Sequence, residues 1–153
     1  MHHDRTPPAV MRSLDLHAAA ALLSLVGVIV SVYLSAVDLS QGQVPLACAN
    51  SGLVNCDLVT SSAQSRLGGV PVALLGVVWF AGMVGLLAFE DRLRLLASPA
   101  LHLAWTGVGV LMVFYLVYAE LFLIGAVCVW CTVVHVLVIG LFLLAVARSQ
   151  PTT

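Results

Sequence analysis

The sequence predicts an all-α integral membrane protein, a bundle of four transmembrane helices with one long loop outside the membrane. Of its 153 residues, 61% are hydrophobic and only 8% are charged, whereas soluble domains carry roughly 25% charged residues. Four apolar segments contain no Asp, Glu, Lys or Arg, namely residues 18–37, 70–89, 100–119 and 121–147. Each reaches the roughly 20 residues that a helix needs to cross a bilayer. Buried helices of a large soluble protein do not explain the pattern, because little amphipathic sequence remains to cover them.

The first and last segments need separate arguments. Residues 18–37 are too long for the apolar region of a secretory signal and lack a clear A-x-A cleavage site, so we expect an uncleaved helix. In the last segment, Glu120 marks the outer interface, residues 121–125 form the turn with the flexible Gly125, and the fourth helix covers about 126–147. With helices at about 18–37, 70–89 and 100–119, the whole chain, residues 1–153, is expected to form a single membrane domain.

The arginines predict the orientation. All six basic residues are arginine, and five lie before the first helix, between the second and third, or after the fourth, while only Arg66 lies on the other side. The positive-inside rule therefore places both termini in the cytoplasm and residues 38–69 outside, in a multi-pass protein of the inner or plasma membrane. A net charge of −1 without a basic cluster argues against nucleic-acid binding.

The loop of residues 38–69 carries two of the four cysteines, Cys48 and Cys56, between turn-forming runs. Residues 53–67 are short and mixed in polarity. They fit either a half-helix that lies on the membrane surface and caps the bundle, or an irregular polar loop.

The other two cysteines, Cys128 and Cys131, form a C-x-x-C motif in "GAVCVWCTVVH" at the outer end of the last helix. Residues three apart share a helix face, so this pair can close a disulfide, and a helix N-terminus favours the thiolate. His135 lies one turn further in on the same face. An ionisable residue in a membrane helix is a functional candidate; the alternative is a histidine that ties this helix to a neighbour.

The four cysteines allow other interpretations. Two structural disulfides remain possible, but a disulfide inside one helical turn constrains little chain entropy, which favours a reactive pair. Haem attachment needs a histidine directly after the second cysteine, where Thr132 stands. Seven residues separate Cys48 from Cys56, which is wider than the usual zinc-ligand spacing, so we expect no metal. Two exchangeable pairs on the oxidising side of a membrane can pass electrons through a mixed disulfide.

The pattern resembles the vitamin K epoxide reductase family, most closely its bacterial members, over roughly residues 15–147. The shared features are C-x₇-C followed by Asp57 and Val59, then Ser61-Ser62, "GGVP" with Ala73 and Gly76, and C-x-x-C on the last helix. The resemblance implies a four-helix bundle around a quinone of the menaquinone, ubiquinone or vitamin K type, capped by the outer loop.

The resemblance also implies roles for single residues. Cys131 is the cysteine next to the quinone, Cys128 exchanges with Cys48 or Cys56, and Ser62 lines the mouth of the pocket. His135 stands where the animal enzymes have a tyrosine that hydrogen-bonds a quinone carbonyl. Many bacterial relatives carry a fused thioredoxin-like domain after the last helix, and here the sequence ends at Thr153. We therefore expect a separate thioredoxin-fold (DsbA-like) protein as the partner.

These observations predict a membrane thiol:quinone oxidoreductase that reoxidises the thioredoxin-fold partner and so drives disulfide formation in exported proteins. Its alternatives are an enzyme that recycles vitamin K through the epoxide or quinone, a non-enzymatic membrane protein with structural disulfides, and a metal-binding membrane protein.

Overall fold

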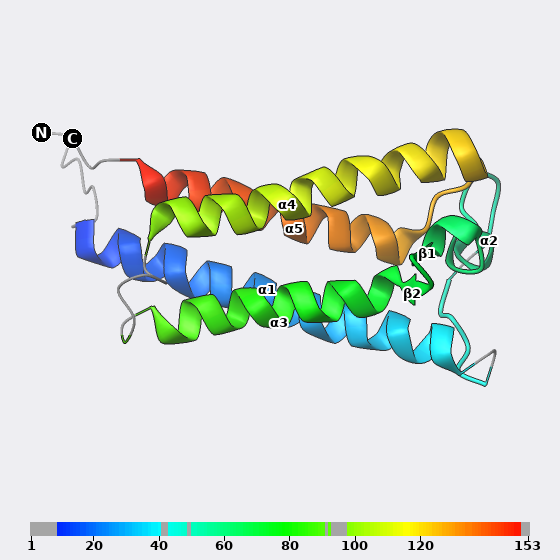
Figure 1. Cartoon of the computed structure of the whole chain (residues 1–153), viewed down its shortest axis with the longest axis horizontal. Helices are drawn as coiled ribbons and strands as arrows, with labels where there is room; N and C mark the ends of the chain where they lie inside the picture. The colour runs from blue at the N-terminus through cyan, green and yellow to red at the C-terminus, as the bar shows by residue number, and fades with distance from the viewer. Residues whose placement is uncertain (1–8, 41–42, 49, 91, 93–97, 151–153) are drawn as a thin grey trace, which may run out of the picture.

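The computed structural model describes residues 9–40, 43–48, 50–90, 92 and 98–150. Within these residues four helices are long and apolar enough to cross a membrane, which confirms the predicted all-α membrane bundle. They are α1 (Ala9–Leu39), α3 (Val72–Phe89), α4 (Pro99–Tyr118) and α5 (Val129–Ser149). Figure 1 shows them side by side, with the start of α1 and the end of α5 at one end and the short elements α2, β1 and β2 at the other.

Helix α1 packs against both α3 and α5, and α4 packs against α5. Gly27 allows the close approach of α1 to α3, because a Cβ at this position would overlap the ring of Phe80. Phe80, Met83 and Leu141 are fully buried and form the centre of the core. Small residues that let helix backbones approach closely are typical of packing inside membranes.

Two tryptophans join α3 to α4. The indole N–H of Trp79 donates to the carbonyl oxygen of Trp105 at 3.2 Å, and that of Trp105 donates to the carbonyl oxygen of Trp79 at 3.3 Å. The two rings are stacked, with centroids 6.4 Å apart. This pair holds α3 and α4 together in the middle of the bundle.

A cluster of charges joins the helices at the end of the bundle where α1 begins and α5 ends. Glu90, directly after α3, accepts two hydrogen bonds from the Arg148 guanidinium of α5, at 2.9 and 3.0 Å. His17 of α1 lies 2.8 Å and His102 of α4 3.7 Å from the same carboxylate. One side chain thus contacts the other three long helices.

The opposite end is covered by the segment between α1 and α3. It contains the short helix α2 (Cys56–Thr60), the 3₁₀ turn η1 (Ala63–Ser65) and the antiparallel strands β1 (Arg66–Leu67) and β2 (Val70–Pro71). Asn55 begins α2, because its side-chain oxygen accepts a hydrogen bond from the Leu58 N–H at 3.0 Å. The cap is therefore partly helical rather than one continuous half-helix.

The connection between α4 and α5 differs from the sequence-based expectation. Helix α4 continues into the π-helical turn η2 (Ala119–Ile124), so Glu120 lies inside a helical stretch and is only 5% exposed. Gly125 then reverses the chain with a φ of 71°, in the left-handed region that suits glycine after a helix. Helix α5 begins at Val129 rather than near Ala126, and Cys128 is its N-cap residue.

Candidate redox site

Backbone hydrogen bonds hold the loop that carries Cys48 and Cys56 against the segment that precedes α5. The Val127 N–H donates to the carbonyl oxygen of Leu53 at 2.9 Å, and the Asn55 N–H donates to that of Val127 at 3.1 Å. The indole N–H of Trp130 donates to the carbonyl oxygen of Ala47 at 2.8 Å. Residues next to each loop cysteine are thereby tied to residues next to Cys128.

The same loop is anchored to α1. The Tyr33 hydroxyl donates to the carbonyl oxygen of Pro45 at 3.2 Å and accepts from the Ala47 N–H at 2.9 Å. At the other end of the loop, the Arg66 guanidinium donates to both carboxylate oxygens of Asp38, at 3.0 and 3.3 Å. The cap is thus fixed over the bundle from two sides.

The loop cysteines form a disulfide, Cys48 to Cys56, with their Cα atoms 6.2 Å apart. Cys56 is completely buried, and its backbone N–H donates to the side-chain oxygen of Asn50 at 3.3 Å. Asn50 in turn donates to the Asp57 carboxylate at 2.9 Å. Cys48 is partly exposed, so it is the end of this disulfide that an external thiol can reach.

The C-x-x-C cysteines are free thiols in the structure. Cys128 is completely buried, and its sulfur accepts a hydrogen bond from the Cys131 backbone N–H at 3.4 Å. The Cys131 thiol hydrogen-bonds the same sulfur, and this bond, with the N–H groups of Cys131 and Trp130, lowers the pKa of Cys128 although burial opposes the shift. A thiol with a lowered pKa is a good leaving group in disulfide exchange.

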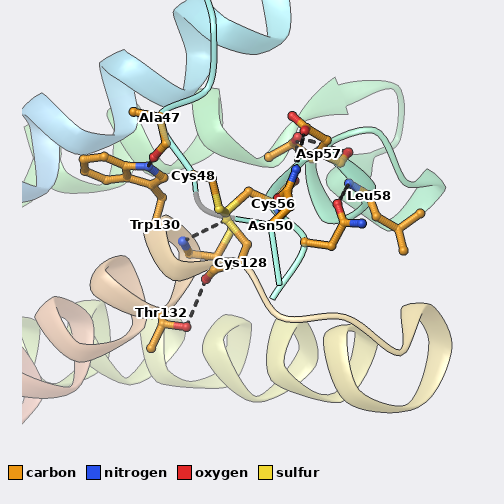
Figure 2. The surroundings of a disulfide bond; sticks show 12 residues. Ala47, Cys48, Asn50, Cys56, Asp57, Leu58, Cys128, Trp130 and Thr132 are labelled. Atoms are coloured by element: carbon orange, nitrogen blue, oxygen red, sulfur yellow. Dashed lines mark hydrogen bonds between the residues drawn. A yellow bond between two sulfur atoms is a disulfide. The ribbon is translucent and has the colours of Figure 1, made fainter. Parts of the chain in front are cut away.

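The structure brings the two cysteine pairs together. Cys56 and Cys128 belong to one buried cluster, and Cys48 and Cys131 pack against it. Figure 2 shows the side chains of Cys48, Cys56 and Cys128 turned toward one another, with the loop on one side and the start of α5 on the other. This arrangement suits thiol–disulfide exchange between the loop and the helix.

Glu120 is a site residue that the sequence pattern did not indicate. Its carboxylate faces the Cys131 thiol and the Cys128 backbone N–H, close enough to interact with both. Glu120 belongs to the π-helical turn η2, in which it is one of the two buried residues. A buried carboxylate beside a reactive thiol is a candidate proton acceptor.

A cavity of about 300 Å³ lies among the four long helices, beneath the cap, and residues of α1, α3, α4 and α5 all line it. Its walls are mostly apolar, from residues such as Leu34, Phe80 and Met112, and Trp79 of the tryptophan pair also lines it. Cys131, Glu120, His135 and Ser62 all contribute to the lining. A mostly apolar cavity with a few convergent polar groups is typical of a small-molecule site.

Two buried polar atoms on the cavity wall have no hydrogen-bond partner among the described residues. They are Nε2 of His135 and the hydroxyl oxygen of Ser31. An unpaired buried polar atom is costly and calls for an explanation, such as a ligand. The hydroxyl of Ser62, in contrast, already donates to the carbonyl oxygen of Val59 at 2.7 Å.

The family comparison agrees with this geometry. The model of the vitamin K epoxide reductase family matches residues 18–146, a range that contains all four cysteines and covers all or most of each of the four long membrane segments. Members of this family are membrane oxidoreductases that use quinones. The chain therefore belongs to the vitamin K epoxide reductase family.

Proposed function

We propose that the protein is a thiol:quinone oxidoreductase that takes electrons from a thioredoxin-fold protein outside the membrane and delivers them to a quinone, so that disulfides form in exported proteins. Cys131 carries this proposal. It packs against the buried cluster of Cys56 and Cys128, and it also lines the apolar cavity. One cysteine residue thus contacts both the cluster proposed for disulfide exchange and the space for the electron acceptor.

Electrons enter at the loop disulfide. A thiolate of the partner attacks the partly exposed sulfur of Cys48, and the second partner thiol then releases the loop as a dithiol while the partner becomes a disulfide. This exchange moves two electrons and two protons from the partner to Cys48 and Cys56, and it needs no other oxidant.

The loop dithiol next reduces the C-x-x-C pair in its disulfide form. Cys56 attacks Cys128, with which it shares the buried cluster, forming a mixed disulfide and freeing the Cys131 thiol. Cys48 then attacks Cys56 and restores the loop disulfide, and Cys128 departs. The lowered pKa of Cys128 favours this last step, because thiols of lower pKa leave faster.

The residues around the cavity fit a quinone, whose flat apolar ring carries two carbonyl oxygens. When bound there, a quinone accepts two electrons and two protons from the dithiol and leaves as the quinol. Glu120 takes the proton of the Cys131 thiol as the disulfide with Cys128 re-forms, and the Nε2 of His135 hydrogen-bonds a carbonyl oxygen. The apolar walls exclude water and hold the ring beside Cys131.

The direct test is a coupled assay with the purified protein in detergent. A reduced thioredoxin-fold protein with a C-x-x-C motif is the donor, a short-chain naphthoquinone or benzoquinone is the acceptor, and quinol formation is followed by absorbance. We expect one quinol for each partner disulfide formed, and no turnover with Cys131→Ser. Reduction of a quinone epoxide in a parallel reaction, without reduction of the plain quinones, would instead favour vitamin K recycling. No reaction with any acceptor would contradict both functions.

A further inference from the structure

Among the residues of α1 whose side chains the structure describes, three serines are buried, and one of these three lacks a hydrogen-bond partner. Ser24 donates to the carbonyl oxygen of Ala20 at 2.8 Å, and Ser35 donates to that of Ser31 at 2.8 Å. Both use the bond to the residue four positions earlier that buried helical serines usually form. Ser31 is only 1% exposed, and its hydroxyl forms no hydrogen bond with any of the described residues.

The position of Ser31 makes its hydroxyl available to a ligand in the cavity. Ser31 lines the cavity, whereas Ser24 and Ser35 are absent from its lining. Gly76 of α3 leaves room for the hydroxyl, because a Cβ at Gly76 would stand 2.9 Å from the Ser31 oxygen. The Ser31 hydroxyl therefore fits between α1 and α3 beside Gly76, at the wall of the cavity.

Ser31 and His135 lie on different helices at related depths. The ring centroids of Tyr33 in α1 and Trp130 in α5 lie 5.1 Å apart, so these two residues lie at about the same depth along the bundle. From that level Ser31 is two residues and His135 five residues further into the membrane, roughly 3 and 8 Å of helix rise. Two unpaired polar groups thus contribute to one cavity from two helices, at heights about one helical turn apart.

We propose that Ser31 is the second hydrogen-bonding residue of the quinone site and holds the carbonyl oxygen at the end of the ring opposite to the one bound by His135. This inference rests on the proposed function. A hydroxyl suits the position because it donates to a carbonyl oxygen and, after rotation, accepts from the hydroxyl of the quinol. Ser31 is a positioning residue in this account: it exchanges no electrons, and it fixes the ring relative to Cys131.

The test compares Ser31→Ala with Ser24→Ala and Ser35→Ala in the purified full chain. Dissociation constants are measured for a short-chain naphthoquinone and a short-chain benzoquinone. Loss of one hydrogen bond should weaken binding by Ser31→Ala about 3- to 10-fold, whereas the two control variants should bind like the wild type. The thermal stability of Ser31→Ala without quinone should not fall, because the hydroxyl has no protein partner to lose.

Infrared spectra identify which end of the ring is affected. With the quinone labelled with ¹³C at one carbonyl or the other, Ser31→Ala should shift one carbonyl band to higher frequency, and His135→Phe should shift the other. Wild-type affinity and unshifted bands in Ser31→Ala would overturn the proposal, as would equal weakening by all three serine variants. If the wild type binds neither quinone, the proposed function itself fails. If the wild type binds and Ser31→Ala binds equally well, only the role of Ser31 fails.

Discussion

The sulfur of Cys128 caps helix α5 by accepting the backbone N–H of Cys131 at 3.4 Å. Side-chain oxygens of Ser, Thr, Asp or Asn usually occupy this N-cap position, and here a thiol takes their place. The hydrogen bond satisfies an N–H at the start of the helix, and the positive end of the helix favours the thiolate. The same contact therefore stabilises the helix and prepares the cysteine for exchange.

Replacing His135 by Phe should weaken quinone binding. The change keeps an aromatic ring but removes both ring nitrogens, including the unpaired Nε2, at a cost of about 1–3 kcal/mol in binding free energy at a buried site. Quinone affinity and KM for quinone are the measurements. Val136→Phe, at a position 63% exposed on the same helix, is the matched control and should bind quinone normally. Unaltered quinone binding in His135→Phe would indicate a role in packing alone.

Replacing Glu120 by Gln should slow the step between Cys131 and the quinone. The amide keeps the shape of the side chain but cannot take the thiol proton, and general-base catalysis contributes about 10²- to 10⁴-fold. We expect kcat to fall about 100-fold while KM for quinone changes little, and Glu120→Asp to retain part of the activity. Exchange between the loop and Cys128 should continue in Glu120→Gln, as measured by trapping the thiols with acid. Turnover within twofold of the wild type would show that Glu120 holds no proton in the reaction.

Replacing Glu90 by Gln should destabilise the bundle without affecting the chemistry. Glu90 contacts Arg148, His17 and His102, and its loss leaves a partly buried Arg148 without its carboxylate. Removal of one partner from a buried pair costs about 3–5 kcal/mol. The Arg148 side chain is 25% exposed, so we expect a smaller loss of about 1–3 kcal/mol in unfolding free energy.

Thermal unfolding in detergent measures the effect of Glu90→Gln. Asp15→Asn, which removes an exposed carboxylate from α1 near the same end of the bundle, serves as the control and should unfold like the wild type. A Glu90→Gln protein of unchanged stability would show that the cluster contributes nothing measurable. Loss of quinone turnover by the folded variant would show that this end of the bundle influences the redox site.

The orientation can be tested by thiol labelling of intact cells. An impermeant maleimide should modify Cys48 after mild reduction, because the arginine distribution places the 38–69 loop outside. A cysteine introduced by Gln150→Cys, in a chain that otherwise lacks cysteine, should react only after lysis, because it lies at the opposite end of the bundle. The reverse pattern would invert the proposed topology.

The four membrane helices were predictable because apolar length alone selects them. The start of the last helix was not. Val127 pairs with Leu53 and Asn55 through backbone groups, which pull the chain into an extended path before Cys128. Backbone hydrogen bonds between distant segments depend on how the two segments are aligned, and the residue types do not reveal that alignment.

Residue types and spacing indicated the cysteines and His135 as site candidates, and the structure places them around one cysteine cluster and one cavity. Glu120 was not among the predicted candidates because a single carboxylate between two apolar segments also fits the membrane surface, whereas the structure buries it in the π-helical turn. Ser31 could not be distinguished from Ser24 and Ser35 by residue type, because the difference lies in which hydroxyl finds a partner.

In the proposed relay, electrons pass from the loop to Cys128 and from there to Cys131. Cys56 and Cys128 share one buried cluster, so they are the pair expected to form the mixed disulfide. The double variant Cys48→Ser/Cys131→Ser leaves only these two thiols and removes both residues that could resolve the bond between them.

The most direct measurement is mass mapping of this double variant under non-reducing conditions after mild oxidation. We predict a peptide pair that joins Cys56 to Cys128 in most molecules, together with loss of quinone reduction. Two other double variants serve as controls. Cys48→Ser/Cys128→Ser leaves Cys56 with Cys131, and Cys56→Ser/Cys131→Ser leaves Cys48 with Cys128. Both should give far less cross-link. Predominant cross-linking of Cys56 to Cys131 instead, with Cys128 left as the thiol nearest the quinone, would contradict the account.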